Sequence, residues 1–369
     1  MIYKNLVQKI SIPADRKTKQ KDYLLAGQLP IIDQGKKLIG GYSNDLTKTI
    51  SCDLPVIVFG DHTKVVKYIS FPFGAGADGI KILKPKENIF PKYLYYATQY
   101  LTLKMEDKGY ARHYQHLEKK DLSVPPLEEQ QRIVARIEEL FSELDAAVAT
   151  LERTKEQLAV YRQAVLKEAF EGCEKKTTIN SVCSHVTDGD HMPPPKSETG
   201  IPFIMISNIE NHRINWENTH FVGQVYYKSI GEKRTPKYGD ILYTVTGSFG
   251  IPILVDFNKE FCFQRHIALL RPNTSILQKY LYYCLQHPTV YKQASDKATG
   301  TAQKTVGLAV LRKLEIPYTD NLELQNTIVS EIESRLSVCD KIEETVNTAL
   351  QEAEAMRQSI LKQAFAGEL

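Results

Sequence analysis

The sequence lacks the features that would place it in a membrane, secreted or metal-binding class. No apolar run reaches the roughly 18 residues that span a bilayer, and the opening MIYKNLVQKI has no apolar core followed by a cleavage site. The six cysteines form no CxxC pair, so neither a zinc ribbon nor a redox motif is present. We therefore expect a cytoplasmic protein without a membrane segment, whose cysteines are buried thiols.

Catalytic motifs are also missing. There is no NPPY-type adenine-methyltransferase motif, no G-x-x-x-x-G-K-[ST] phosphate loop and no HExxH. HVTDGDH at residues 185–191 gathers two His and two Asp, but a short loop before three prolines is more typical of a turn whose Asp side chains bond local backbone. DHTK at 61–64 contains the acid and lysine of a nuclease site but lacks a second carboxylate on a neighbouring strand. TGSFG at 246–250 resembles a phosphate-binding loop, but no helix pattern follows it to supply a dipole. We predict no catalytic, cofactor-binding or metal-binding residue.

What the sequence does contain is an internal repeat. LKEAFEG at residues 166–172 returns as LKQAFAG at 361–367. An offset of 195 places residues 128–172 on 323–367, and about one third of the 45 aligned positions are identical. A chain of this length is expected to hold more than one domain. The repeat predicts a tandem duplication of a globular piece followed by a long helix.

The globular pieces are predicted to mix strands and helices. KYLYYATQYLTLK, from residue 92, and KYLYYCLQHPTVYK, from residue 279, each have the pattern of a helix beside a sheet. Runs of β-branched and aromatic residues bounded by Gly, Pro, Asn or Asp predict strands. These runs are residues 55–61, 64–71, 79–83, 202–207, 240–247 and 266–270.

The segments after the globular pieces have the pattern of a coiled coil. Residues 128–171 contain no Pro or Gly, and their apolar residues recur at alternating spacings of four and three. The predicted seam comprises Ile133, Ile137, Leu140, Leu144, Ala147, Leu151, Thr154, Leu158, Tyr161 and Val165 in the first copy, and Ile328, Ile332, Cys339, Ile342, Val346, Ala349, Ala353, Met356 and Ile360 in the second. At 1.5 Å per residue each helix would extend about 65 Å, too long to pack on one small domain, so we expect the two helices to pair.

The pair is expected to be antiparallel, because a parallel pair would require the intervening domain to carry the chain back along the whole coil. We therefore predict an α+β fold with two globular mixed α/β domains at opposite ends of a long antiparallel two-helix coiled coil, related by a pseudo-twofold axis. The predicted parts are residues 1–125 (first domain), 126–172 (central helix), 173–317 (second domain) and 318–369 (C-terminal helix).

Charge is distributed unevenly over these parts. Residues 1–125 carry a net charge of +8 and residues 173–317 carry +5, whereas residues 126–172 carry −4 and 318–369 carry −6, with His neutral. Two basic domains joined by acidic helices suit a polyanion contacted at two places, because neutralised phosphates supply much of the affinity for nucleic acid. An ordinary solvated surface explains a modest positive charge equally well.

Several stretches together resemble a known family. In chain order they are GYSND at 41–45, VIVFGDHT at 56–63, PLEEQQRIVARIE at 126–138, the tail LKEAFEG, DGDHMPPP at 188–195, GDILYTVTGSFG at 239–250, FQRHIALLRP at 263–272 and the tail LKQAFAG. In this order they are similar to the DNA-specificity (S) subunit of type I restriction-modification systems, over nearly the whole chain.

The resemblance implies two target-recognition domains that each read one half of a bipartite target in double-stranded DNA, with the helices acting as a spacer. It also implies two methyltransferase (M) subunits docked on the helices and adjoining domain faces, and restriction/translocase (R) subunits in the full assembly. S-adenosylmethionine, ATP and Mg are then expected on those partner subunits and not on this chain.

Base reading requires side chains that reach base edges, typically Arg and Lys to guanine and Asn or Gln to adenine. The richest stretch of the first domain is GYARHYQHLEKK at 109–120, whose counterpart in the second domain is TGTAQKTV at 299–306. A further cluster lies in the second domain. The candidate DNA-binding residues are Arg112, His113, Tyr114, Gln115, Lys119, Thr246, Ser248, Phe249, Gln264, Arg265, His266, Gln303, Lys304 and Thr305, and Thr301 belongs to the same stretch.

The helix ends repeat Arg162 as Arg357 and Phe170 as Phe365. We predict partner contact for the two arginines and packing onto the adjacent domain for the two phenylalanines. Two other functions stay open at this stage: a single-chain nuclease or methyltransferase with an unrecognised site, and a coiled-coil scaffold that binds only proteins. The sequence determines neither the DNA target nor the spacer length.

Overall fold

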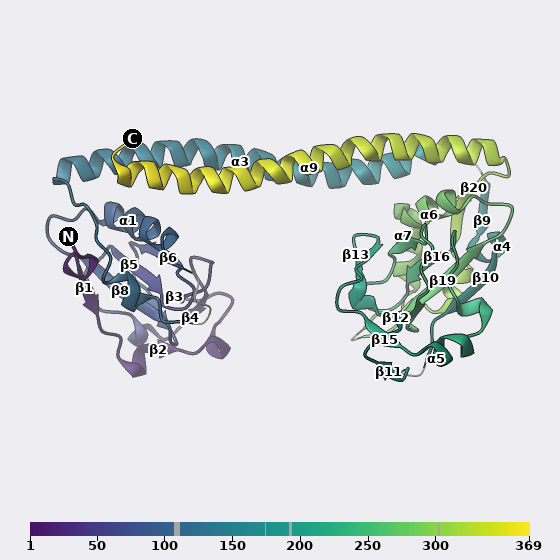
Figure 1. The fold of residues 1–369 in the computed structure, drawn as a ribbon, viewed down its shortest axis with the longest axis horizontal. Helices are drawn as coiled ribbons and strands as arrows, with labels where there is room; N and C mark the ends of the chain where they lie inside the picture. The colour runs from purple at the N-terminus through teal and green to yellow at the C-terminus, as the bar shows by residue number, and fades with distance from the viewer. Residues whose placement is uncertain (107–110, 174, 192–193, 302) are drawn as a thin grey trace. The chain divides into compact units, whose positions relative to one another are not determined.

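A computed structural model of the chain describes residues 1–106, 111–173, 175–191, 194–301 and 303–369 (Figure 1). The chain divides into two compact units. Unit 1 comprises Met1–Glu152 with Asn347–Leu369, and unit 2 is Arg153–Val346. Each unit therefore contains a globular part and segments of both long helices.

Unit 1 begins with the first globular part. Its strands are β1 (Val7–Ile10), β2 (Lys17–Thr18), β3 (Leu29–Ile32), β4 (Gly41–Ser43), β5 (Val56–Gly60), β6 (Val66–Ile69), β7 (Gly74–Gly76) and β8 (Ile80–Pro85). Its helices are α1 (Pro91–Leu103) and α2 (Tyr114–Leu117), with short 3-10 turns η1 (Tyr3–Asn5), η2 (Ala14–Arg16), η3 (Gln20–Asp22) and η4 (Leu46–Lys48).

The main sheet of unit 1 has the strand order β1-β8-β5-β6, with every pair antiparallel, and helix α1 contacts β5 and β6. A second sheet has the order β2-β7-β3-β4. Strand β5 is buried on both faces, as its apolar run predicts. Ile57 and Phe59 lie in the cluster that includes α1, whereas Val56 and Val58 lie with Ile32 and other residues of the second sheet.

Unit 2 contains the second globular part. Its strands are β9 (Lys175–Thr178), β10 (Cys183–Asp188), β11 (Lys196–Ser197), β12 (Ile201–Ile204), β13 (Ile209–Glu210), β14 (Arg213–Ile214), β15 (His220–Val222), β16 (Ile241–Thr244), β17 (Pro252–Leu254), β18 (Cys262–Phe263), β19 (Ile267–Pro272) and β20 (Glu315–Tyr318). Its helices are α4 (Ile179–Val182), α5 (Gln224–Ser229), α6 (Gln278–Gln286), α7 (Pro288–Lys297) and α8 (Leu308–Arg312), with η5 (Ile206–Asn208) and η6 (Glu232–Arg234).

The main sheet of unit 2, β10-β19-β16-β17, repeats the order and the antiparallel pairing of the main sheet of unit 1. The registers agree as well, because Ile57 faces Leu83 in the first sheet and Ile241 faces Leu270 in the second. The second sheets share one parallel pair, β3 with β7 and β12 with β18. The predicted duplication of a mixed helix-and-strand domain is confirmed.

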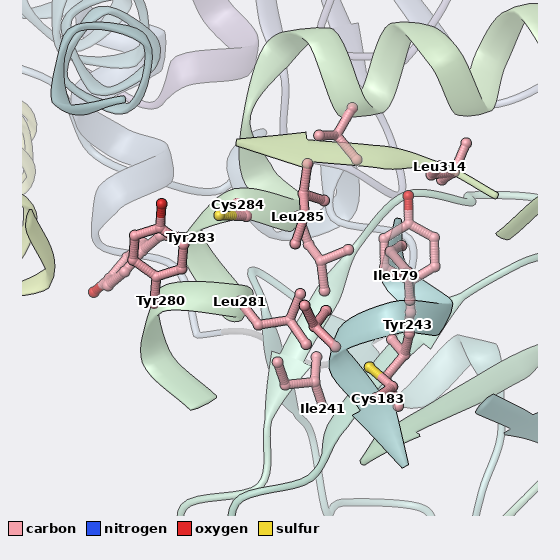
Figure 2. Packing of buried hydrophobic residues seen from close by; sticks show 14 of the residues in the cluster. Ile179, Cys183, Ile241, Tyr243, Tyr280, Leu281, Tyr283, Cys284, Leu285 and Leu314 are labelled. Carbon is pink, nitrogen blue, oxygen red and sulfur yellow. The ribbon is translucent and has the colours of Figure 1, made fainter. Parts of the chain in front are cut away.

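The core of unit 2 lies where helix α6 packs on the main sheet (Figure 2). Leu281 and Cys284 of α6 are fully buried in one cluster with Ile241 and Tyr243 of β16. Burial raises the pKa of the Cys284 thiol well above its ordinary value, so this side chain acts as a small apolar group.

All six cysteines are free thiols. The prediction that they are buried holds for four and is wrong for two. The buried ones are Cys183, Cys262, Cys284 and Cys339, and the partly exposed ones are Cys52 and Cys173.

The second of the two helices predicted beside a sheet is interrupted. Residues 279–292 form α6 and α7, which meet at His287. Because Pro288 disfavours helical backbone at the residue before it, His287 adopts an extended conformation and begins α7 with Pro288 at its first position. In the first domain the corresponding stretch lacks proline and α1 runs without a break.

The long helices are α3 (Leu127–Ala169) and α9 (Leu322–Ala366), and they pair in both units. In unit 2, Arg162 contacts Asp340 at 2.7 Å, and in unit 1 Arg357 contacts Asp145. The two contacts are equivalent in the repeat, because Arg357 corresponds to Arg162 and Asp340 corresponds to Asp145. A half-exposed ion pair contributes at most about 1 kcal/mol, so these pairs fix alignment more than stability.

The antiparallel direction is visible within unit 2 alone. Moving along α3 from Arg162 to Glu168, the partner on α9 moves backwards from Glu343 to Arg335, with contacts of 2.9 Å and 2.8 Å. The predicted antiparallel pairing is therefore confirmed.

Four predicted seam residues are exposed: Ala147, Tyr161, Ile342 and Met356. An α-helix repeats every 3.6 residues and drifts away from a strict heptad seam, so the buried face shifts along each helix. Tyr161 instead lies beneath the guanidinium of Arg335, 5.4 Å from its ring centre. Conversely, Phe141 was not predicted in the seam but is buried, in edge contact with Tyr96 of α1.

The helix ends pack on the domains through the repeated phenylalanines. Phe365 lies 5.3 Å from Tyr93 of α1 in unit 1, and Phe170 lies 5.3 Å from Tyr280 of α6 in unit 2, both measured between ring centres. The packing predicted for these two side chains is confirmed.

A buried glutamine joins each long helix to its domain. The Oε1 of Gln130 accepts from the backbone N–H of Phe90, which precedes α1, and its Nε2 donates to the carbonyls of Asn88 and Pro125 at 3.0 Å and 2.9 Å. Gln325, which occupies the same repeat position as Gln130, repeats this pattern. It accepts from Leu277 and donates to Ser275 and Thr319.

We expect Gln130→Glu to destabilise unit 1 by about 2–4 kcal/mol, because the carbonyls of Asn88 and Pro125 lose their donor and face a buried carboxylate instead. The measurement is the urea midpoint of the full chain. The matched control is Gln131→Glu, at an exposed neighbour in the same helical turn, where an acidic residue near a helix start is tolerated. Equal midpoints for the two variants would contradict the role given to Gln130.

Candidate nucleic-acid interface

Three loops meet at one end of the main sheet of unit 2. They follow β16, connect β18 to β19 and precede α8. The backbone N–H of Val245 donates to the carbonyl of His266 at 2.9 Å, and that of Val306 donates to Val245 at 2.8 Å. Gly247 donates to the carbonyl of Lys304 at 3.0 Å. The residues predicted from separate stretches of the second domain are thus brought together.

The side chains of these loops divide by exposure. Thr246 and Phe249 are buried, and Phe249 stacks on Tyr291 with ring centres 5.8 Å apart. The Thr305 hydroxyl donates to that of Thr246 at 3.3 Å, which joins two of the loops. The exposed candidates are Ser248, Arg265, Thr301, Gln303 and Lys304, and those of intermediate exposure are Gln264, His266 and Thr305. Ala302, in the same predicted stretch, lies outside the described residues.

Two neighbouring pockets, of about 340 and 360 Å³, flank the turn between β18 and β19. His191, Arg265 and His266 line both of them. The exposed Arg265 therefore stands between two concave surfaces, and within the described part of the chain its guanidinium makes no ion pair.

The two aspartates of the DGDH stretch hold neighbouring side chains. Asp188 contacts His191 at 2.8 Å and Arg234 at 3.8 Å, and the Tyr226 hydroxyl donates to Asp190 at 2.5 Å. Across the described residues there is no group of three or more His, Cys, Asp or Glu side chains arranged to hold a metal ion. Met192 and Pro193 of this stretch lie outside the described residues.

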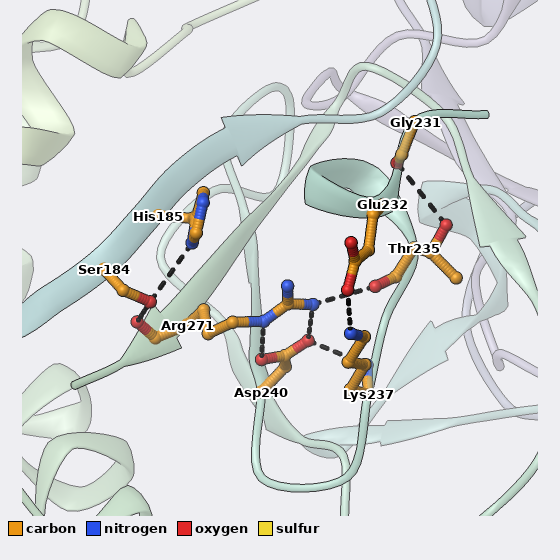
Figure 3. A network of polar contacts seen from close by, with 8 residues as sticks. All are labelled: Ser184, His185, Gly231, Glu232, Thr235, Lys237, Asp240 and Arg271. Atoms are coloured by element: carbon orange, nitrogen blue, oxygen red, sulfur yellow. Dashed lines mark hydrogen bonds and ion pairs between the residues drawn. The ribbon is translucent and has the colours of Figure 1, made fainter. Parts of the chain in front are cut away.

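A polar network holds the loop that carries Arg234 (Figure 3). Arg271 of β19 binds the buried Asp240 through two contacts, 2.8 Å from Nε and 2.7 Å from Nη2, and also donates to the carbonyl of Thr235 at 2.9 Å. Asp240 accepts from the backbone N–H of Lys237 at 2.7 Å. This fork geometry holds residues 235–240, just before β16, against β19, and so positions the neighbouring Arg234, which contacts Asp188.

His266 is electrostatically coupled to its neighbour Arg265. Partial burial lowers its pKa from the ordinary value, and the neighbouring Arg265 cation lowers it further. The imidazole is therefore neutral near pH 7, and presents one hydrogen-bond donor and one acceptor.

In unit 1 the equivalent loops meet at Asp61, which follows β5. The backbone N–H of His113 donates to the Asp61 carbonyl, and that of Tyr114 to its carboxylate, both at 2.8 Å. Lys81 lies 3.2 Å from the same carboxylate. The predicted candidates His113 and Tyr114 are buried, and Tyr114 belongs to the core cluster that includes α1. Their positions are explained by packing.

The other candidates of that stretch are exposed, and they are Arg112, Gln115 and Lys119. Gly109 and Tyr110, which begin it, lie outside the described residues. Sequence reasoning did not single out the turn between β7 and β8, although it corresponds in the repeat to the turn that carries Arg265. Its residue Asp78 contacts Lys17 at 3.2 Å.

The arginines predicted to contact partners are used within the chain. Arg162 binds both Asp340 and Glu343, and Arg357 binds Asp145 and lies 4.4 Å over the Phe141 ring. Both side chains keep part of their surface exposed, and partner contact stays a prediction.

Similarity to known proteins covers both globular parts. Residues 8–158 and 178–352 each match the type I restriction modification DNA specificity domain. The chain belongs to this family. No described helix of this family member is long and apolar enough to cross a membrane.

Curated relatives agree with the assignment. The chain is 26% identical over 277 residues to the specificity subunit of type I restriction enzyme EcoBI of Escherichia coli, which is 67% of this chain but 58% of that protein's length. It is 23% identical over 353 residues to the EcoR124I/EcoR124II specificity subunit of Escherichia coli, covering 88% of this chain and 83% of that one.

Solved structures show the same fold. A chain from a study of complex assembly and conformational transition of the type I R-M system aligns with a TM-score of 0.71 at 17% identity, over 100% of this chain and 97% of that one. The HsdS subunit from Thermoanaerobacter tengcongensis aligns with a TM-score of 0.51 at 18% identity, over 100% and 96%.

We expect Arg265→Ala to raise the pKa of His266, because removing a neighbouring cation makes protonation easier. The imidazole should then gain its proton at a higher pH than in the unchanged protein, although burial still holds its pKa below the ordinary value. An NMR titration of the His266 ring measures this. Lys228→Ala, at an exposed position on α5, is the control and should leave the titration unchanged. A lower or unaltered pKa in Arg265→Ala would contradict the coupling.

Proposed function

We propose that the chain is a non-catalytic DNA-reading subunit that directs the methyltransferase and restriction subunits of a type I restriction-modification complex. Each globular domain reads one half of a bipartite target in double-stranded DNA. The proposal is supported most directly by the repeated match to the DNA specificity domain, one match for each globular part.

The internal comparison of the two domains supports separate half-sites. Their main sheets share strand order and register, yet the loops at the end of β5 and of β16 differ. The first loops carry Asp61 and Asp78, and the second carry Arg265 and Lys304. Equal scaffolds with different loop chemistry are suited to reading two different sequences, because base identity is read by the side chains that reach base edges.

Charge supports DNA as the ligand. Both globular parts are net basic and both helical parts are net acidic. Phosphate neutralisation favours binding through the globular parts, and the acidic helices repel the DNA backbone. The helices are then available to protein partners.

We propose that the boundaries 1–125, 126–172, 173–317 and 318–369 separate recognition from spacing. Helices α3 and α9 each continue from one unit into the other without Pro or Gly, and in this proposal they set the separation of the half-sites. Two methyltransferase subunits dock on the helices, where Arg162 and Arg357 contribute. S-adenosylmethionine, ATP and Mg belong to the partner subunits, and the assembly acts in the cytoplasm.

The deciding experiment is methylation profiling of DNA exposed to the chain together with its cognate methyltransferase subunits. Wild-type chain should give a bipartite motif. A variant in which residues 1–125 and 173–317 are exchanged should give the two half-motifs in exchanged positions, because each domain carries its own reading loops and meets its long helix through the same glutamine contact.

The wild-type chain, assembled in parallel with the same methyltransferase subunits, is the control for complex formation. Half-motifs that stay in place after the exchange would refute the assignment. Methylation or cleavage by the chain alone would favour a single-chain enzyme, and an absence of salt-dependent DNA affinity would favour a protein-only scaffold.

We further expect Lys304→Ala to reduce the salt dependence of DNA binding by the full chain. The exposed lysine lies next to the loop after β16, since the Gly247 N–H donates to its carbonyl. Losing one phosphate contact lowers the slope of log K against log salt by about one. Fluorescence anisotropy at several salt concentrations measures the slope. Lys228→Ala removes the same charge from α5 and serves as the matched control. Equal slopes for both variants would remove Lys304 from the interface.

A further inference from the structure

The turn before β8 in unit 1, which carries Asp78, and the turn before β19 in unit 2, which carries Arg265, have opposite charges at one structurally equivalent position. Register defines the equivalence, because Gly60 faces Ile80 in unit 1 and Thr244 faces Ile267 in unit 2. Ile80 and Ile267 are therefore equivalent positions. The residues that precede them, Gly79 and His266, are equivalent as well.

Hydrogen bonds confirm this alignment independently. The carbonyl of Gly79 accepts from the N–H of Asp61 at 2.6 Å, and the carbonyl of His266 accepts from the N–H of Val245 at 2.9 Å. Asp61 directly follows β5 and Val245 directly follows β16. One residue before Gly79 and His266 stand Asp78 in unit 1 and Arg265 in unit 2.

Both side chains project from a backbone held in place. In unit 2, the N–H of Arg265 donates to the carbonyl of Asp190 at 3.1 Å, and the N–H of Ile267 donates to the carbonyl of Gln264 at 3.1 Å, which closes a tight turn. In unit 1, Asp78 adopts a φ of 53° and the next residue, Gly79, a φ of 81°, so the turn is set by two left-handed residues.

The surroundings differ in a way that fits two ligands. Arg265 is exposed between two pockets, and among the described residues no ion pair occupies its fork of donors. The Asp78 side chain is 90% exposed, and the ammonium of Lys17 lies 3.2 Å from its Oδ1. The lysine offsets the charge of the carboxylate, which lets a polyanion approach. Lys17 donates to Oδ1 and not to Oδ2, so Oδ2 is left to accept from a ligand.

We propose that this position is specificity-determining in both domains, with Arg265 reading a guanine and Asp78 reading a base amino group. The inference rests on the proposed function and adds to it the chemistry of one base in each half-site. An arginine fork matches the O6 and N7 acceptors of guanine, and a carboxylate accepts from the amino group of cytosine or adenine. The half-site of the second domain therefore contains a guanine that Arg265 specifies.

Methylation profiling of the full complex tests the inference. Arg265→Ala should relax one guanine position in one half-motif, with at least a tenfold loss of discrimination at that position, roughly the lower end of what one bidentate base contact contributes. Asp78→Ala should relax one position, a cytosine or an adenine on the contacted strand, in the other half-motif. Arg265→Lys keeps the positive charge but not the two parallel donors of the guanidinium. It should retain less than half of the wild-type preference for guanine at that position, on a logarithmic scale.

Lys228→Ala is the control, since it removes a cation from an exposed position on α5, outside the loops that carry the candidate DNA-binding residues. It should leave both half-motifs intact. Circular dichroism and urea midpoints confirm that the variants fold, as expected for exposed side chains.

The outcomes distinguish a failure of the proposed function from a failure of the base assignments. A wild-type complex that yields no bipartite motif overturns the proposed function itself. A wild-type motif that persists unrelaxed in Arg265→Ala and in Asp78→Ala overturns the further inference alone, as does relaxation of both half-motifs by either single variant. Full recovery in Arg265→Lys would show that charge and not the fork is read, and would also overturn it.

Discussion

The pairing of α3 with α9 is the constraint on which the rest of the structure depends. The core of unit 1 includes Ile360, Leu361 and Ala364, which come from the last turns of α9, more than 200 residues after the domain they complete. Each large apolar side chain buried contributes about 1.5–3 kcal/mol, so a first domain without the C-terminal helix would expose a substantial part of its core. Unit 2 is one contiguous segment, Arg153–Val346, so it is the first domain that stays incomplete until the C-terminal helix has folded back onto it.

Two kinds of contact then fix how each domain meets the helices, and they do different work. The aromatic pairs, Phe365 with Tyr93 and Phe170 with Tyr280, bury apolar area but tolerate sliding. The buried glutamines do not, because Gln130 and Gln325 each make three directional hydrogen bonds whose loss leaves buried polar groups unpaired. A domain attached in this way has one orientation on its helix, which a reader of DNA requires if its loops are to meet base edges in a fixed register.

The features carried by repetition and periodicity were predictable, and those that depend on strand register were not. The duplication, the long helices and the main strands follow from matching segments and apolar runs. The ion pairs of Arg162 and Arg357 within the chain were not predicted. The seam was misassigned at Ala147, Tyr161, Ile342 and Met356, since a heptad template ignores helix drift. The second sheet of unit 1 was missed because its strands are short, as with Lys17–Thr18. The convergence of Thr246, Arg265 and Lys304 depends on pairing partners that no local pattern encodes.

A duplicated scaffold explains why opposite charges can occupy equivalent positions without cost to the fold. The carbonyls of Gly79 and His266 accept the same backbone hydrogen bond, so the hydrogen bonding that holds the turn is independent of the side chain one residue earlier. Asp78 and Arg265 are exposed, and exposed substitutions usually change stability by less than about 0.5 kcal/mol. Selection on such a position acts through the ligand alone. The residues that hold the turns and the residues that face outward are therefore separate sets, and a reading domain can change its target while Gln130, Asp240 and the main sheet stay as they are.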